Sequence, residues 1–132
     1  MQPIIECVPN FSEGRNLQTI KAITDAIESV DGIRLLDVDP GKATNRTVVT
    51  LVGSPEDVIE AAFRGIQKAA ELIDMRNHSG EHPRMGATDV CPLIPISGIS
   101  MEETALYAQK LAQRVAEELH IPTYLYEYAQ AN

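Results

Sequence analysis

Two segments with strong helical periodicity, separated by two runs of strand-forming residues, constrain the fold of this chain most. Residues 16–30 and 54–73 place apolar side chains three and four positions apart, the spacing of an amphipathic helix. Between them, residues 33–39 and 46–53 are rich in apolar and β-branched side chains, which favour strands. The central half of the chain therefore predicts the order helix, strand, strand, helix.

Four further segments complete the predicted order: a strand over residues 4–10, an extended segment over 88–96, a helix that begins after Ser100, and a strand over 122–128. Ser54 is the expected N-cap of the second helix, and Ser100 with Glu103 forms a capping box for the third. Pro92 and Pro95 favour an edge or irregular strand for residues 88–96, because proline cannot donate a ladder hydrogen bond.

This order, β-α-β-β-α-β followed by α-β, predicts an α/β protein of the α+β type with a ferredoxin-like arrangement. We expect a mixed or antiparallel sheet with helices on one face, and 132 residues fit a single domain over 1–132. The opposite sheet face is then left free. An apolar face of this kind needs a partner domain, a second subunit or a ligand to cover it.

Charge and hydropathy exclude several classes of protein. The net charge of −8 argues against nonspecific nucleic-acid binding, which needs a basic surface. No apolar run is long enough to span a membrane, and the first residues lack the basic and apolar regions of a signal peptide, so we expect a cytoplasmic protein. The two cysteines, Cys7 and Cys91, are expected to be reduced and buried as small apolar side chains.

The segment from residue 76 to residue 91, RNHSGEHPRMGATDVC, is the strongest candidate for function. It has no regular periodicity, and irregular segments of about a dozen residues inside a domain are usually functional or disordered. Its Arg76 and Arg84, with Lys42 and Arg46 of the connection predicted between residues 40 and 45, would form a local positive site if the two connections meet.

His82 is the candidate for proton transfer in this segment, because an imidazole titrates near neutral pH and Pro83 holds the preceding backbone extended. The alternative is an exposed loop histidine. His78 and His82 have the HxxxH spacing of a helical metal site, but Gly80 and Pro83 disfavour a helix and no third ligand is evident. We therefore expect no metal.

Four polar residues outside this segment have both a structural and a functional interpretation. Asp39, before Pro40-Gly41, is typical of a turn, or it could orient a histidine or hold a cationic nitrogen. Asn45 and Arg46 could simply begin a strand, or they could grip a substrate carboxylate, for which the planar guanidinium is suited. Asn10 could form a turn after Pro9 or contact a ligand.

The sequence resembles the formiminotransferase domain, the glutamate formimidoyltransferase family, which occurs alone or fused to a cyclodeaminase. The stretches that carry the resemblance are CVPNFSEGRN (7–16), LLDVDPGKATNRTVVTLVG (35–53) and IDMRNHSGEHPRMGATDVCPLIP (73–95). It extends over nearly the whole chain, through residues 124–129. It implies that residues 1–132 correspond to the N-terminal subdomain of the transferase unit and that the second subdomain is absent.

The resemblance implies a transferase that moves the formimino group of N-formimino-L-glutamate to N5 of tetrahydrofolate, in histidine degradation and one-carbon metabolism. Tetrahydrofolate is then a co-substrate, and His82 is the catalytic residue. Arg46 and Arg84 are the candidates to bind the substrate carboxylates, and Asp39 could hold the amidinium. The full set of expected substrate-binding residues is Asp39, Asn45, Arg46, Arg84, Asn10 and Gly86.

The expected partners are formiminoglutamate, tetrahydrofolate, and a second formiminotransferase subdomain or partner chain, in a homo-oligomer without nucleic acid or membrane. Three alternatives stay open at this point. The chain could be a noncatalytic folate-binding or assembly subunit, or a relative that processes 5-formyltetrahydrofolate. Without the resemblance, it could also be a ferredoxin-like regulatory domain that binds a small anion.

Overall fold

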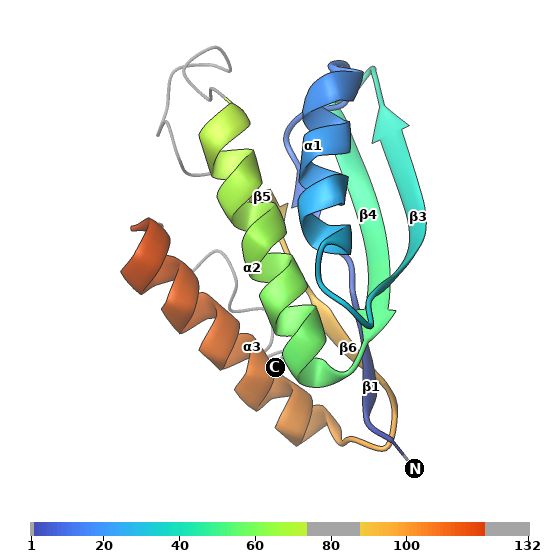
Figure 1. Ribbon diagram of the computed structural model, residues 1–132, viewed down its shortest axis with the longest axis vertical. Coiled ribbons are helices and arrows are strands. Elements are labelled where there is room, and N and C mark those ends of the chain that lie inside the picture. Colours follow the sequence, from blue (N-terminus) through green and yellow to red (C-terminus); the bar gives the residue numbers. More distant parts are fainter. Residues whose placement is uncertain (1, 74–87, 121–132) are drawn as a thin grey trace.

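The computed structural model describes residues 2–73 and 88–120, whose helices and strands are drawn in Figure 1. In chain order these elements are β1 (Ile4–Cys7), β2 (Asn10–Phe11), α1 (Leu17–Glu28), β3 (Arg34–Gly41), β4 (Arg46–Gly53), α2 (Pro55–Leu72), β5 (Thr88–Val90), β6 (Leu93–Ser97), α3 (Met101–Arg114) and the π-helical turn η2 (Val115–Leu119). The strand predicted over residues 122–128 lies outside the described residues.

Among the described residues the sheet has six strands, and all of their pairings are antiparallel. β1 and β2 are two parts of one interrupted strand, and β3 pairs with β4. The interrupted strand β1–β2 thus lies between β4 and the β5–β6 segment, and β3 lies beyond β4. This is the strand order of the split βαβ in a ferredoxin-like fold. The predicted α+β fold is confirmed, with an antiparallel sheet.

Prolines interrupt the first and last strands at the same level. The sequence predicted one strand over residues 4–10, but β1 ends at Cys7 and β2 begins at Asn10. Across the interruption, the Val8 amide donates to the Pro92 carbonyl at 3.1 Å, and the Val49 amide donates to the Pro9 carbonyl at 3.0 Å. Both carbonyls remain in the ladder although neither proline has an N–H to give.

β3 is longer than the sequence predicted. Residues 40 and 41 were expected to begin a connection, but Pro40 pairs with Thr47 and Gly41 pairs with Arg46. Within the described part of the chain, β3 is an edge strand with β4 as its single neighbour. Pro40, which has no N–H, therefore deprives no second strand of a hydrogen bond. The turn between β3 and β4 is therefore confined to residues 42–45.

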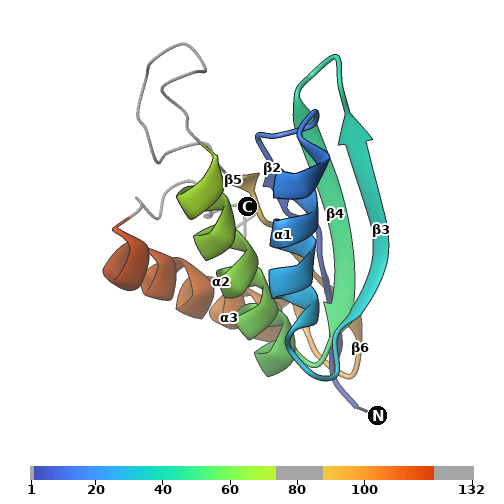
Figure 2. The ribbon, with the colours of Figure 1, turned by 45° about the horizontal axis from the view of Figure 1, so that its top comes forward.

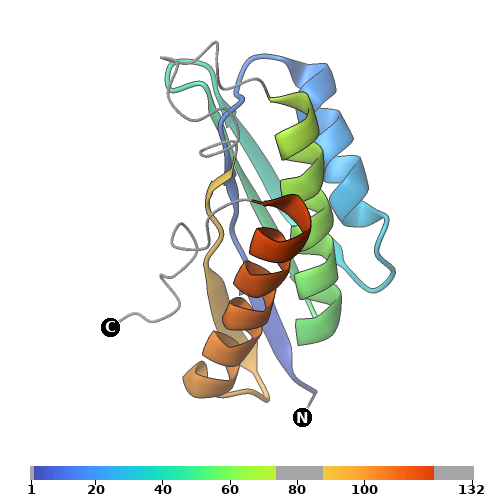
Figure 3. The same cartoon turned by 90° about the vertical axis from the view of Figure 1, so that its left-hand side faces the viewer.

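All three helices lie on one face of the sheet, as Figure 3 shows, and α2 lies between α1 and α3 (Figure 2). The strands bury alternate residues against this layer: in β4, Thr47, Val49 and Leu51 are buried, whereas the residues between them are only half-buried. Gly65 of α2 allows α1 to approach closely, because a β-carbon there would lie 2.9 Å from Cγ1 of Ile27.

The predicted helix caps are confirmed at α3 and only in part at α2. The Ser100 hydroxyl accepts a hydrogen bond from the Glu103 amide at 3.0 Å, and the Glu103 carboxylate accepts one from the Ser100 amide at 3.0 Å. Ser54 occupies the N-cap position of α2, with Pro55 following, but its side chain makes no capping hydrogen bond. The predicted N-cap position of Ser54 is thus confirmed, and Pro55 at the first position suits a helix start.

The sheet face opposite the helices, here called the open face, has no helix or strand over it among residues 2–73 and 88–120. The alternation of the strands places Glu6, Val48, Thr50, Val52 and Ile94 on this face. Ile94 is 39% exposed, and the two valines are half-buried. The predicted free face is thus present in the described fold. None of the described helices has the length and apolar character to cross a membrane.

Candidate functional site

One end of the sheet brings together the start of β5, the end of β2 and the β3–β4 turn. Thr88, the first residue of β5, pairs with Phe11 of β2. Phe11 in turn pairs with Thr47 of β4, which pairs with Pro40 of β3. Thr88 is the first described residue of the segment 76–91 that carries His82, and it lies at the same end of the sheet as the β3–β4 turn.

Asn10 and Asp39, two of the predicted site residues, lie in one row across the sheet. Asn10 pairs with Val48 of β4, and Val48 pairs with Asp39 of β3 on its other side. Because Phe11 and Thr47 are buried against the helices, this alternate row belongs to the open face. With neighbouring strands about 4.8 Å apart, the backbones of Asn10 and Asp39 are separated by roughly 10 Å.

Arg46 lies on the same face, at the beginning of β4. Arg46 is two residues before Val48, and side chains two residues apart in a strand point to the same face. It pairs with Gly41 of β3. Its side chain is exposed, as is that of Asp39. The structure thus brings three predicted residues, Asn10, Asp39 and Arg46, to one region of the open face.

Asn45 and Asn10 have described hydrogen bonds within the protein. Asn45 has a left-handed backbone with φ of 56°, and its Oδ1 accepts a hydrogen bond from the Gly14 amide at 2.9 Å. Asn10 donates from Nδ2 to the Val8 carbonyl at 3.4 Å, a long and weak contact. Asn45 therefore joins the β3–β4 turn to the chain that follows β2.

The sequence predicts no role for residues 13–15. Thr47 Oγ1 donates to the Glu13 carbonyl at 2.5 Å, and Arg15 Nε donates to the Lys42 carbonyl at 3.0 Å. No local pattern indicates these partners, because they lie about thirty residues further along the chain.

Basic side chains gather at this end of the sheet. Arg15, Lys42 and Arg46 are all exposed there, and Arg15 was not among the predicted residues. Asp37 and Asp39 on β3 supply carboxylates beside them. The region therefore offers groups of both signs, as recognition of a ligand with carboxylates and a cationic nitrogen requires.

His82, Arg84 and Gly86 lie outside the described residues, as do Arg76 and His78. Their predicted roles stay predictions. Among residues 2–73 and 88–120, no group of three or more His, Cys, Asp and Glu side chains is arranged to hold a metal ion.

Two surface clefts in the helical layer lie apart from the predicted residues. A cleft of about 220 Å³ between α2 and α3 is lined by Glu56, Ile59, Glu60, Tyr107, Lys110 and Arg114. Its central charges are already paired, since Arg114 Nη1 donates to Glu60 at 2.6 Å and stacks on Phe63 at 3.8 Å from the ring centre. The hydrogen bond from Arg114 lowers the pKa of Glu60.

A second cleft, of about 320 Å³, lies where α2 approaches η2 and is lined by Gln67, Ala70, Glu71, Glu118, Leu119 and His120. Neither cleft contains Asn10, Asp39 or Arg46. The region at the end of the open face is therefore the better candidate site.

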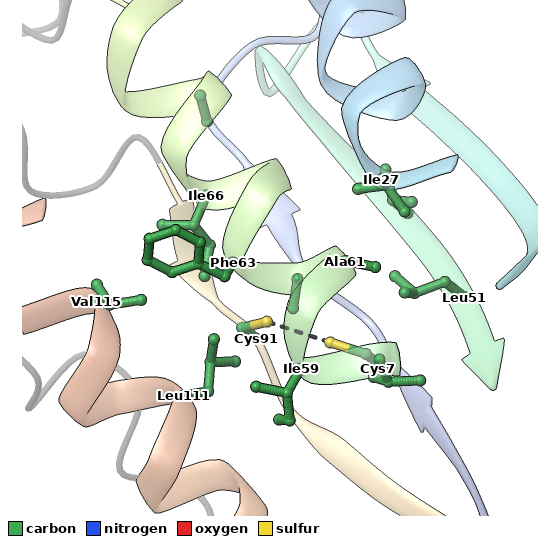
Figure 4. Close-up of a cluster of buried hydrophobic side chains, with 14 of the residues drawn as sticks. Cys7, Ile27, Leu51, Ile59, Ala61, Phe63, Ile66, Cys91, Leu111 and Val115 are labelled. Atoms are coloured by element: carbon green, nitrogen blue, oxygen red, sulfur yellow. Dashed lines mark hydrogen bonds between the residues drawn. The ribbon is translucent and has the colours of Figure 1, made fainter. Parts of the chain in front are cut away.

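Cys7 and Cys91 are both fully buried, as the sequence predicted (Figure 4). Their sulfur atoms are 3.2 Å apart, within hydrogen-bonding distance for thiols. Burial raises the pKa of the Cys7 thiol, and the hydrogen bond with Cys91 raises it further. A buried thiol with a raised pKa is a poor nucleophile, so Cys7 serves packing rather than catalysis.

Comparison with known proteins relates the chain to one family. The model of the formiminotransferase domain, N-terminal subdomain, matches residues 4–132. The chain is 58% identical over 126 residues to formimidoyltransferase-cyclodeaminase from Rattus norvegicus, covering 96% of this chain and 23% of the relative. It is 50% identical over 126 residues to glutamate formimidoyltransferase from Thermoplasma acidophilum, covering 96% of this chain and 42% of the relative.

A third relative is glutamate formimidoyltransferase from Streptococcus pyogenes serotype M1, which is 47% identical over 127 residues. The match covers 96% of this chain and 42% of the relative. The chain thus spans about a quarter of the length of the formimidoyltransferase-cyclodeaminase and about two fifths of the length of the two glutamate formimidoyltransferases.

Proposed function

The chain belongs to the formiminotransferase family as its N-terminal subdomain, and on this premise we propose that it contributes to transfer of the formimino group from N-formimino-L-glutamate to N5 of tetrahydrofolate. The family match over residues 4–132 carries the proposal. The names of its relatives, glutamate formimidoyltransferase and formimidoyltransferase-cyclodeaminase, describe transfer of the same group. Tetrahydrofolate acts as co-substrate.

His82 is the proposed acid and base of the reaction. N5 of tetrahydrofolate attacks the amidine carbon of formiminoglutamate, and the tetrahedral adduct collapses by breaking the bond to the glutamate nitrogen. N5 loses one proton and the leaving nitrogen gains one, so a single imidazole, the side chain suited to proton transfer at neutral pH, can accept the first and donate the second. The products are glutamate and 5-formiminotetrahydrofolate, and no net proton is consumed.

The open face supplies the proposed substrate contacts. Arg46 and Arg84 would pair with the carboxylates of formiminoglutamate, since a guanidinium binds a carboxylate through two parallel hydrogen bonds. Asp39 would hold the amidinium or steady His82, with Asn10 and Gly86 contributing polar contacts. The position of Asn10, Asp39 and Arg46 at the end of the sheet where β5 begins supports this assignment.

A second formiminotransferase subdomain, on the same or another chain, is the proposed partner. This chain spans only part of its relatives, and the open face presents Val48, Val52 and Ile94 without a described element over them. Such a face is stabilised when another layer removes it from water. We place the assembled protein in the cytoplasm as a homo-oligomer, acting in histidine degradation and one-carbon metabolism.

A noncatalytic folate-binding or assembly subunit is the second candidate function. Such a subunit would bind folate without forming product, which separates it from the transferase in the experiment below. A relative that processes 5-formyltetrahydrofolate has no separate support in the described residues.

The deciding experiment assays this chain alone and together with the second subdomain, with formiminoglutamate and tetrahydrofolate as substrates. We expect 5-formiminotetrahydrofolate and glutamate to form in equal amounts with the pair, and little product from the chain alone. Folate binding without product in the pair supports the noncatalytic alternative. Neither binding nor product in the pair removes both.

A further inference from the structure

Residues 13–15 and 41–47 form a compact contact, here called the turn clasp, beside the first residue of β4. Three hydrogen bonds join its two sides: the Gly14 amide to Asn45 Oδ1 at 2.9 Å, Thr47 Oγ1 to the Glu13 carbonyl at 2.5 Å, and Arg15 Nε to the Lys42 carbonyl at 3.0 Å. Gly14 is buried at its centre.

Gly14 lies directly against the backbone of Arg46. A β-carbon at position 14 would stand 2.6 Å from the Arg46 nitrogen and 2.7 Å from the Arg46 oxygen, and it would also overlap the Gly41 carbonyl. These are backbone atoms, which cannot rotate away as a side chain can. The missing side chain of Gly14 therefore allows the two segments to touch.

The clasp packs against the last pair of the β3–β4 ladder. In this pair Arg46 lies opposite Gly41. β2 does not reach it, because β2 ends with Phe11 opposite Thr47, one residue short of Arg46. Gly14 lies against the backbone of both residues of the pair, Gly41 and Arg46.

Asn45 connects this arrangement to the turn. Its left-handed backbone, φ 56°, is a conformation that asparagine adopts more readily than most residues. With Oδ1 bound to the Gly14 amide, the side chain bridges the β3–β4 turn and residues 13–15.

We infer that Asn45 is a positioning residue: its side chain holds Gly14 against the backbone of Arg46 and so fixes where the Arg46 guanidinium enters the candidate site. The inference deepens the proposed function and rests on it for the role of Arg46 in binding substrate. Asn45 acts through its neighbour rather than by touching the substrate. Loss of its carbonyl oxygen should weaken binding in the ground state and the transition state alike, which raises KM and leaves kcat nearly unchanged.

The test compares Asn45→Gly, Asn45→Asp and Thr44→Ala in the protein that carries both subdomains. Asn45→Gly keeps the left-handed backbone and removes the acceptor, while Asn45→Asp keeps an acceptor oxygen at the same place. Thr44→Ala is the matched control, because Thr44 lies in the same turn and its hydroxyl contacts only the Gly41 carbonyl, at 3.4 Å, among the described hydrogen bonds.

Hydrogen exchange of the Gly14 amide tests the clasp without reference to activity. We expect exchange about three- to tenfold faster in Asn45→Gly, the loss expected for one hydrogen bond, with exchange near that of the unchanged protein in Asn45→Asp and Thr44→Ala. Unchanged exchange in Asn45→Gly would overturn the inference whether or not the protein transfers formimino groups.

Kinetics then tests positioning. Asn45→Gly should raise KM for formiminoglutamate about three- to tenfold with kcat within about twofold, and Asn45→Asp should restore most of the affinity. If the unchanged protein is active and Asn45→Gly has normal KM, the positioning role is wrong while the proposed function stands. If the protein without substitutions is inactive but Asn45→Gly still speeds exchange of the Gly14 amide, the proposed function is wrong. The role of Arg46 in binding substrate is then wrong as well, and the clasp itself is established.

Discussion

The sulfur atoms of Cys7 and Cys91 lie 3.2 Å apart in the buried core, where β1 meets the residue that follows β5. This contact ties the first strand to the segment that rejoins the sheet after residue 87. Burial, and then the hydrogen bond with Cys91, raise the pKa of the Cys7 thiol in the folded protein. The free energy of unfolding should therefore decrease at alkaline pH.

Stability should fall above about pH 8.5, where an unfolded thiol begins to lose its proton while the folded Cys7 thiol keeps it. Below that pH both states hold the proton, and the Cys7 contribution is constant. For one proton the slope reaches at most about 1.4 kcal/mol per pH unit. Urea unfolding measured between pH 7 and pH 10 checks this, with Cys7→Ala as the comparison. Equal slopes in the two proteins would show that Cys7 does not titrate in this way.

Gly14→Ala should lower the free energy of unfolding by about 2–3 kcal/mol, the range for an overpacked site that cannot relax. The new methyl group meets backbone atoms of Gly41 and Arg46. Thermal and urea unfolding provide the measurement.

Gly41→Ala is the matched control for this substitution. Its methyl group would meet the Thr44 hydroxyl at 2.9 Å, a side-chain atom that can rotate away, so we expect a cost below about 1 kcal/mol. Similar losses for the two glycines would mean that the turn clasp is looser than described.

Ser100→Ala should destabilise the protein by about 1 kcal/mol, because it removes a side-chain cap from the Glu103 amide. Ser54→Ala, at the same position of α2, should cost only a few tenths of a kcal/mol, since Ser54 makes no such bond. The difference between the two variants in urea unfolding is the informative quantity. A larger effect at Ser54 would contradict the assignment of the caps.

His82→Ala should lower turnover by about 10²-fold or more in the protein with both subdomains, the usual contribution of a general acid or base. Steady-state formation of 5-formiminotetrahydrofolate measures it, and His78→Ala is the matched control with a small expected effect. Near-normal turnover in His82→Ala would exclude this histidine from proton transfer.

The order helix, strand, strand, helix over residues 16–53 and 54–73 could be predicted because α1 and α2 carry apolar stripes and β4 carries a β-branched run, which are local patterns. The end of β3 could not, since Asp39-Pro40-Gly41 has the composition of a turn and becomes a strand only because β4 pairs with it. The split of the first strand at Pro9 likewise depends on Pro92, which is remote in sequence.

The candidate site was predictable in part for a similar reason. Asn10 and Arg46 begin strands and Asp39 lies within β3, and their appearance together on the open face follows from the register. The bond between Asn45 and Gly14 spans thirty-one positions and has no local signature, so only the folded chain could reveal that the Asn45 side chain is engaged within the protein.

The adjacent interruptions at Pro9 and Pro92 divide β1 from β2 and β5 from β6, while β4 runs past them without a break. On one side of the interruptions, β1 and β6 pair beneath α2 and α3. On the other side, β2 and β5 are short, and their pairing shifts register between Asn10 and Phe11. In this short part Phe11 and Thr88 are each only 2% exposed, whereas Asn10 is half-buried on the open face, so a substitution at Asn10 can alter the site with less effect on the core than one at Phe11 or Thr88.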